Sequence, residues 1–126
     1  MKIHVHAGAH KTASTYLQTI LELNRPALTE AGIGCAPLPE LRKSLTNRLH
    51  ELSPSTFRIE DFAPLFFHGH DAPREVRGLI VSDENLLGLT SAFLRSGQLY
   101  ARAGDNLSHL RSLIPDREIV LFVSIR

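Results

Sequence analysis

The sequence predicts an α/β protein with a mainly parallel sheet and flanking helices. Residues 2–7, 77–82 and 118–125 are alternating or continuously apolar stretches with the length of strands. Between them, apolar residues recur at the spacing of amphipathic helices. Strands that alternate with helices are joined by right-handed crossovers, which make the strands parallel. We therefore expect these three strands to lie parallel in one sheet.

Length and composition favour a single domain over residues 1–126. With 43% hydrophobic residues, the chain has enough apolar material for one core. Its 14 basic and 13 acidic residues nearly cancel, so charge indicates neither a nucleic-acid partner nor a membrane surface. No signal peptide and no apolar run near the ~20 residues of a membrane span are present. Together with a single cysteine, Cys35, which we expect to be buried, these features favour a cytoplasmic protein.

The first strand and the first helix follow from the opening residues. Along residues 2–7, apolar side chains share one side of the strand, while His4 and His6 share the other. We expect His4 to be half-buried. A helix is expected from about Ser14 to the glycines of "AGIG". Pro26 interrupts its pattern, which predicts a break just before it, near residues 24 and 25.

Three further helical segments are expected. The segment at residues 40–52 places four leucines on one face: Leu41, Leu45, Leu49 and Leu52. A short helix follows, with Ser55 or Thr56 as its N-cap. Residues 98–113 form another amphipathic pattern, whose apolar face consists of Leu99, Ala103, Leu107 and Leu110.

A polar turn, residues 82–85, follows the second predicted strand. Asp83 is expected at the surface of this turn. Two interpretations of Glu84 remain open. A carboxylate here can stabilise the start of a helix at residues 85–89, or it can accept a proton in catalysis.

The segment between the first strand and the first helix has the composition of an anion site. Gly8 leaves backbone N–H groups unobstructed, and Lys11 adds a positive charge. The start of the helix adds unpaired N–H groups and the positive end of its dipole. Hydroxyl donors are Thr12, Ser14 and Thr15. The segment is not a Walker A loop, because only two residues separate Gly8 from Lys11 and no second glycine precedes the lysine.

Three ordered segments resemble the sulfotransferases that use 3′-phosphoadenosine 5′-phosphosulfate (PAPS), most closely their bacterial and carbohydrate-type branch. The pattern His6-x-Gly8-x-x-Lys11-Thr12-x-Ser14-Thr15 resembles the family's phosphosulfate loop. Residues 80–86 resemble its hydrophobic-Ser-x-Glu segment, and residues 119–126 resemble the strand that leads to its 3′-phosphate site. The sequence departs from the family at Ala13, where glycine is usual, and at His10, where a small residue or proline is common.

The resemblance implies a P-loop-like three-layer fold and a sulfuryl transfer. PAPS would be the donor, and a hydroxyl or amine of a small molecule or carbohydrate would be the acceptor. The implied donor-binding residues are Gly8, Ala9, His10, Lys11, Thr12, Ala13, Ser14, Thr15 and Arg126. Lys11 would neutralise the bridging oxygen and Glu84 would take the acceptor proton, with His10 as the next candidate; no metal is expected. Since the family continues beyond the third motif, we expect this chain to be the front portion of a longer enzyme.

Three alternatives remain open at this stage. His4, His6 and His10 could join His68 and His70 as metal ligands, although no acidic residue follows at a ligand spacing. An irregular P-loop of a nucleoside-triphosphate kinase or hydrolase would require Mg²⁺. A non-catalytic nucleotide-binding fragment is the third alternative.

Overall fold

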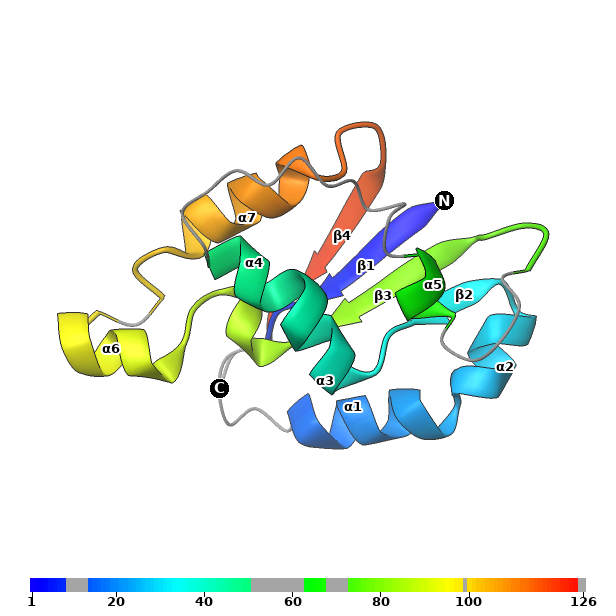
Figure 1. Cartoon of the computed structure of the whole chain (residues 1–126), viewed down its shortest axis with the longest axis horizontal. Coiled ribbons are helices and arrows are strands. Elements are labelled where there is room, and N and C mark those ends of the chain that lie inside the picture. Colours follow the sequence, from blue (N-terminus) through cyan, green and yellow to red (C-terminus); the bar gives the residue numbers. More distant parts are fainter. Residues whose placement is uncertain (9–13, 51–62, 68–72, 99, 125–126) are drawn as a thin grey trace.

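The centre of the protein is a sheet of four parallel strands in the order β2-β3-β1-β4 (Figure 1). The computed structural model describes residues 1–8, 14–50, 63–67, 73–98 and 100–124. The strands are β1 Lys2–His6, β2 Ile33–Cys35, β3 Gly78–Ser82 and β4 Glu118–Phe122. β1 pairs in parallel with β3 on one side and with β4 on the other, so the predicted arrangement of the three strands is confirmed.

The sequence pattern does not predict β2, because its glycines resemble a helix stop. Gly32, before the strand, has a φ of +79°, a conformation that favours glycine. Gly34 lies inside the strand, where an added Cβ would come within 2.8 Å of side-chain atoms of Leu79 and Phe66. Glycine is therefore needed here for close packing rather than for a turn.

The helices occupy the connections between strands. The first connection contains α1 Ser14–Leu23 and α2 Arg25–Glu30, and their separation at Asn24 confirms the break predicted from Pro26. The second contains α3 Leu38–Leu41, a π-helical turn Arg42–Thr46, α4 Asn47–His50 and α5 Ala63–Phe66. The third contains a 3₁₀ turn Glu84–Leu86, α6 Thr90–Ser96 and α7 Ala103–Ser112.

The predicted helices at residues 98–113 and after residue 52 compare with the structure in different ways. α7 begins at Ala103, later than the predicted residue 98, and Tyr100 just before it has a left-handed φ of 58°. A helix cannot continue through that backbone conformation. The proposed caps Ser55 and Thr56 lie outside the described residues, as do Leu52 and Leu99.

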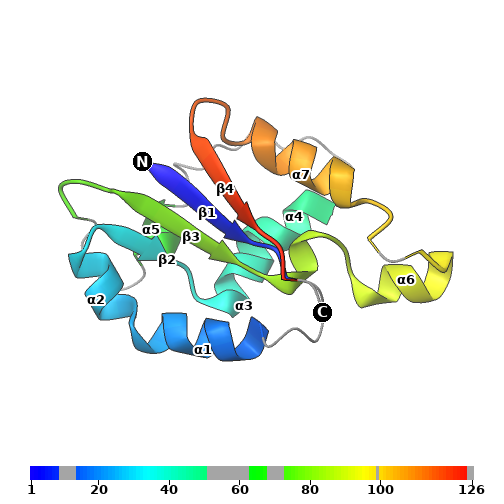
Figure 2. The ribbon, with the colours of Figure 1, turned by 180° about the vertical axis from the view of Figure 1, so that it is seen from behind.

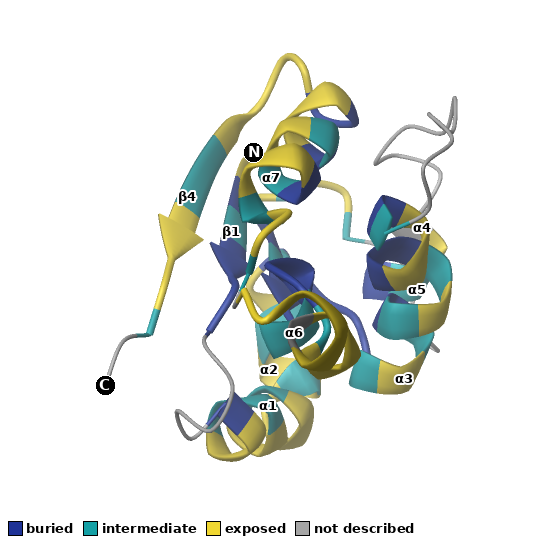
Figure 3. Ribbon diagram, turned by 90° about the vertical axis from the view of Figure 1, so that its left-hand side faces the viewer, coloured by how far each residue is buried: buried dark blue, intermediate teal, exposed yellow. Residues whose placement is uncertain are grey.

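One face of the sheet carries the core. Helices α3, α4, α5 and α7 lie on this side of the strands, as Figure 3 shows. Ile3 and Val5 are fully buried here, beside Leu79 and Val81 of β3. Leucines of the predicted face, Leu41, Leu45 and Leu49, pack in the same cluster and are at most 1% exposed. The leucine spacing thus predicted a true core contact.

The opposite face of the sheet is more open (Figure 2). Leu17 and Leu21 of α1 reach this face and line a groove on it together with His4 and Phe122. His4 is half-buried, as predicted, and its ring stacks on Phe122 with 6.1 Å between ring centroids. None of the helices in the described part of the chain is long and apolar enough to cross a bilayer.

Candidate functional site

His6 connects the carboxyl ends of three adjacent strands. Its Nδ1 lies 3.0 Å from Ser82 Oγ, at the end of β3, and its Nε2 lies 3.1 Å from Ser124 Oγ, just beyond β4. Burial lowers the pKa of His6 below its ordinary 6.5, and the nearby Glu84 only partly opposes this effect. The lowered pKa favours the neutral imidazole, and each of its ring nitrogens lies within hydrogen-bond distance of a serine hydroxyl.

Asp83 is the most fully bonded carboxylate at this edge. Its Oδ1 accepts hydrogen bonds from Arg42 Nε at 3.1 Å, Arg42 Nη2 at 3.0 Å and the backbone N–H of Asn85 at 3.0 Å. Its Oδ2 accepts a hydrogen bond from Thr46 Oγ1 at 2.8 Å. The prediction that Asp83 lies at the surface is wrong, because its side chain is 0% exposed. Paired and hydrogen-bonded in this way, the charge can be buried.

Glu84 stands between α1 and the π-helical turn. Its Oε1 accepts a hydrogen bond from Arg42 Nη2 at 2.9 Å, and its Oε2 accepts one from Gln18 Nε2 at 2.9 Å. Burial alone would raise the pKa of Glu84, but the hydrogen bonds from Gln18, its own backbone and Arg42 outweigh burial and lower the pKa. Glu84 is consequently an ionised carboxylate whose side chain keeps 19% of its surface exposed.

Both interpretations of Glu84 stay open, because Glu84 lies in the first turn of a short helix, where a carboxylate is stabilising, although the hydrogen-bonding cap is another residue. The 3₁₀ turn Glu84–Leu86 is preceded by Asp83, whose side chain accepts the N-terminal backbone hydrogen bond from Asn85. The capping role therefore belongs to Asp83. Glu84 instead bonds to side chains from two other elements, and each of its oxygens retains capacity for a further hydrogen bond.

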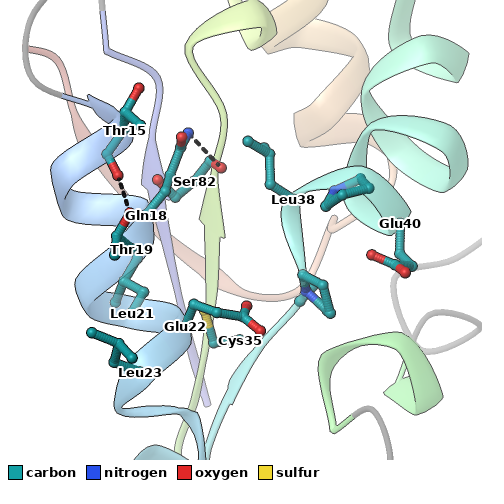
Figure 4. A pocket seen from close by; sticks show the side chains of 13 residues that line it. Thr15, Gln18, Thr19, Leu21, Glu22, Leu23, Cys35, Leu38, Glu40 and Ser82 are labelled. Carbon is teal, nitrogen blue, oxygen red and sulfur yellow. Dashed lines mark hydrogen bonds between the residues drawn. The ribbon is translucent and has the colours of Figure 1, made fainter.

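A cleft of about 500 Å³ lies beside this network, between α1 and the segment that runs from β2 into α3 (Figure 4). Gln18 and Ser82 are on its wall, and Gln18 Nε2 also lies 3.5 Å from the Ser82 carbonyl oxygen. Cys35 lines the cleft but is 5% exposed, as predicted for a buried cysteine. Burial raises the pKa of its thiol to about 11, so Cys35 is not a nucleophile at neutral pH.

The structure places only part of the predicted donor site. Gly8 is buried directly after β1, Ser14 is the buried first residue of α1, and Thr15 is exposed and lines the cleft. Ala9, His10, Lys11, Thr12, Ala13 and Arg126 lie outside the described residues. The second turn of α1 and Glu84 lie near one another, since Gln18 donates a hydrogen bond to Glu84.

Four members of the network were not assigned a role from the sequence: Gln18, Arg42, Thr46 and Ser124. Arg42 is 41 residues from Asp83, and Ser124 is 118 residues from His6. No local spacing connects residues so far apart. A cationic partner for Asp83 could be expected only once the side chain was known to be buried, because a buried carboxylate needs a partner of opposite charge.

Among the residues that the structure describes, no three of His, Cys, Asp and Glu are close enough to hold a metal ion. Of the proposed histidine ligands, His10, His68 and His70 lie outside those residues. Comparison of the chain with protein-family models, with curated proteins and with solved structures finds no match.

Proposed function

We propose that this protein is a P-loop-like sulfotransferase that moves a sulfuryl group from PAPS to a hydroxyl or amine acceptor. The observation that carries the proposal is the hydrogen bond between Gln18 of α1 and Glu84 at the end of β3. It joins the helix that follows the predicted phosphosulfate loop to the one carboxylate predicted to accept a proton. Both lie at the carboxyl edge of the sheet, where ligands of parallel α/β proteins bind.

The topology supports an anion site after β1. From β1 the chain runs to β2, which forms one edge of the sheet. It later reaches β4, which forms the opposite edge and lies on the other side of β1. Such a change of direction at the carboxyl ends of strands is the usual ligand crevice. α1 is ten residues long and has no acidic residue in its first turn, so its dipole and the first N–H groups, which have no partner within a helix, favour an anion.

The chemistry needs one proton acceptor and charge neutralisation. The acceptor oxygen or nitrogen attacks sulfur and forms the new bond, while its proton passes to Glu84. The bond between sulfur and the bridging oxygen breaks, and its electron pair stays on the departing 5′-phosphate of 3′-phosphoadenosine 5′-phosphate. Lys11 would stabilise the charge that develops on that oxygen. As in phosphoryl transfer, most of the rate would come from positioning.

Calorimetry tests the donor class directly. The chain should bind 3′-phosphoadenosine 5′-phosphate without Mg²⁺, and Lys11→Ala should weaken that binding and abolish sulfuryl transfer without unfolding the protein. The control is Lys2→Ala, which also removes one positive charge but at an exposed residue away from the site. It should leave binding unchanged. Binding of ATP only with Mg²⁺, or unchanged transfer in Lys11→Ala, would overturn the proposal.

A further inference from the structure

We propose that the cleft between α1 and α3 is the acceptor site, and that it takes an alcohol or amine with an apolar body and a neutral or positive charge. This inference rests on the proposed function, because the cleft only has an acceptor if the protein transfers a group. It adds where that acceptor binds, its apolar body and its charge, which the resemblance to sulfotransferases leaves open.

The cleft has the size and lining of a small-molecule site. Its volume of about 500 Å³ lies within the ~300–1,000 Å³ typical of ligand pockets. Leu21 and Leu23 of α1 form one wall, and Leu38 lies on the other, as Figure 4 shows. Two prolines, Pro37 and Pro39, extend the second wall. A hydrocarbon body in this space would release water from apolar surface on both walls.

The polar end of the cleft lies beside the hydrogen-bond network of Glu84. Gln18 lines the cleft and donates to Glu84 Oε2 at 2.9 Å, and Ser82 lies beside it. Thr15, in the first turn of α1, lines the same cleft. An acceptor hydroxyl or amine at this end would therefore approach both the proton acceptor and the start of the helix that follows the predicted phosphosulfate loop.

The charge of the lining excludes an anionic acceptor. Glu22 and Glu40 line the cleft from opposite walls (Figure 4), and among the described residues that line it none is basic. Glu22 is ion-paired with Arg25, which stands outside the lining. Two carboxylates on a lining without a basic residue repel an anionic ligand and favour one that is neutral or positively charged.

Three probes with the same hydrocarbon test the class: hexan-1-ol, hexylamine and hexanoate. We expect amide signals of residues 19, 36 and 38 to shift in NMR titrations with the alcohol and the amine, and hexanoate to bind roughly tenfold or more weakly than hexylamine. Glu40→Gln should reduce that preference for the amine. Equal binding of hexylamine and hexanoate, or shifts confined to other parts of the chain, would overturn the inference.

A cleft-filling variant locates the binding. Thr19 is an exposed α1 residue that lines the cleft, so Thr19→Trp should block the space with little risk to folding. Tyr16→Trp is the matched control, because Tyr16 is 71% exposed on the same helix and outside the cleft lining. We expect at least roughly tenfold weaker hexylamine binding and slower transfer in Thr19→Trp alone. Equal behaviour of the two variants would contradict the assignment.

The inference and the proposed function fail in different ways. If 3′-phosphoadenosine 5′-phosphate binds but neither hexylamine nor hexan-1-ol does, the acceptor class is wrong while the donor stands. If the nucleotide does not bind, the proposed function fails, and with it the acceptor role of the cleft, whatever the amine does.

Discussion

The covered face of the sheet and its carboxyl edge are built in opposite ways. On the covered face, Val5 and Leu45 are 0% exposed and belong to one apolar cluster. At the carboxyl edge, several buried residues are polar, among them His6, Ser82 and Asp83, and Asp83 is as deeply buried as those apolar side chains. Its burial depends on hydrogen bonds from Arg42 and Thr46 rather than on apolar contact.

This difference separates stability from function along the molecule. Apolar burial is non-directional and can come from any well-filled core, so its loss reduces the free energy of unfolding. The polar edge is directional, because each donor must meet a particular acceptor. Directional groups with exposed surface, as at Glu84, can also act on a ligand. Substitutions on the covered face should therefore change the free energy of unfolding alone, whereas substitutions at the polar edge should change turnover, stability or the pH dependence of stability, according to the residue.

Leu45→Ala should give the largest loss of stability. Leu45 is fully buried beneath the sheet, so its truncation leaves a cavity and should cost about 2–5 kcal/mol of the free energy of unfolding. Phe122→Ala on the open face is the comparison, since Phe122 is 50% exposed and should cost no more than about 1 kcal/mol. Urea unfolding measures both. Similar losses would mean that the two faces are equally important for folding.

Glu84→Gln should act on turnover rather than on stability. The amide keeps the shape of the side chain but removes the proton acceptor, so sulfuryl transfer should fall by ~100-fold or more with little change in donor affinity. The amide oxygen of the variant can still accept a hydrogen bond from Arg42, and the melting temperature should change little. Near-normal turnover together with a lower melting temperature would assign Glu84 to structure alone, and His10 would be the next proton acceptor to test.

Asp83→Asn should show the reverse pattern at the neighbouring position. The amide has one oxygen where the carboxylate has two, so it cannot accept from both Arg42 and Thr46 as Asp83 does. We expect a loss of about 1–3 kcal/mol in the free energy of unfolding. Thr46→Ser, which keeps the hydroxyl, is the control and should be much milder. A fully stable Asp83→Asn protein would show that the charge is not needed at this position.

The sequence predicted what depends on local pattern. The break before Pro26 and the buried face of Leu41, Leu45 and Leu49 follow from the pattern within one element, and the parallel sheet follows from the alternation of strands and helices along the chain. The pattern missed β2, whose three residues form a strand only by pairing with β3. It could not supply the partners of the polar edge either, because Arg42 and Ser124 become neighbours of the site only through the fold.

The stability of the polar edge should depend on pH through His6, and this is the smallest effect expected. Burial lowers the pKa of His6 below 6.5, so between the folded pKa and 6.5 the unfolded chain binds more protons than the folded one. Stability should therefore be fully present above pH 6.5 and decrease as the pH falls through that window. Protonation would also make both ring nitrogens donors, so the one serine hydroxyl that donates to the neutral ring would have to reorient and accept. Urea unfolding at about pH 7.5 and about pH 5.5 should show a larger loss for the natural protein than for His6→Gln. The other histidines are common to both proteins, and the lowered pKa of Glu84 acts only at more acidic pH. An equal loss in the two proteins would show that His6 does not make the edge sensitive to acid.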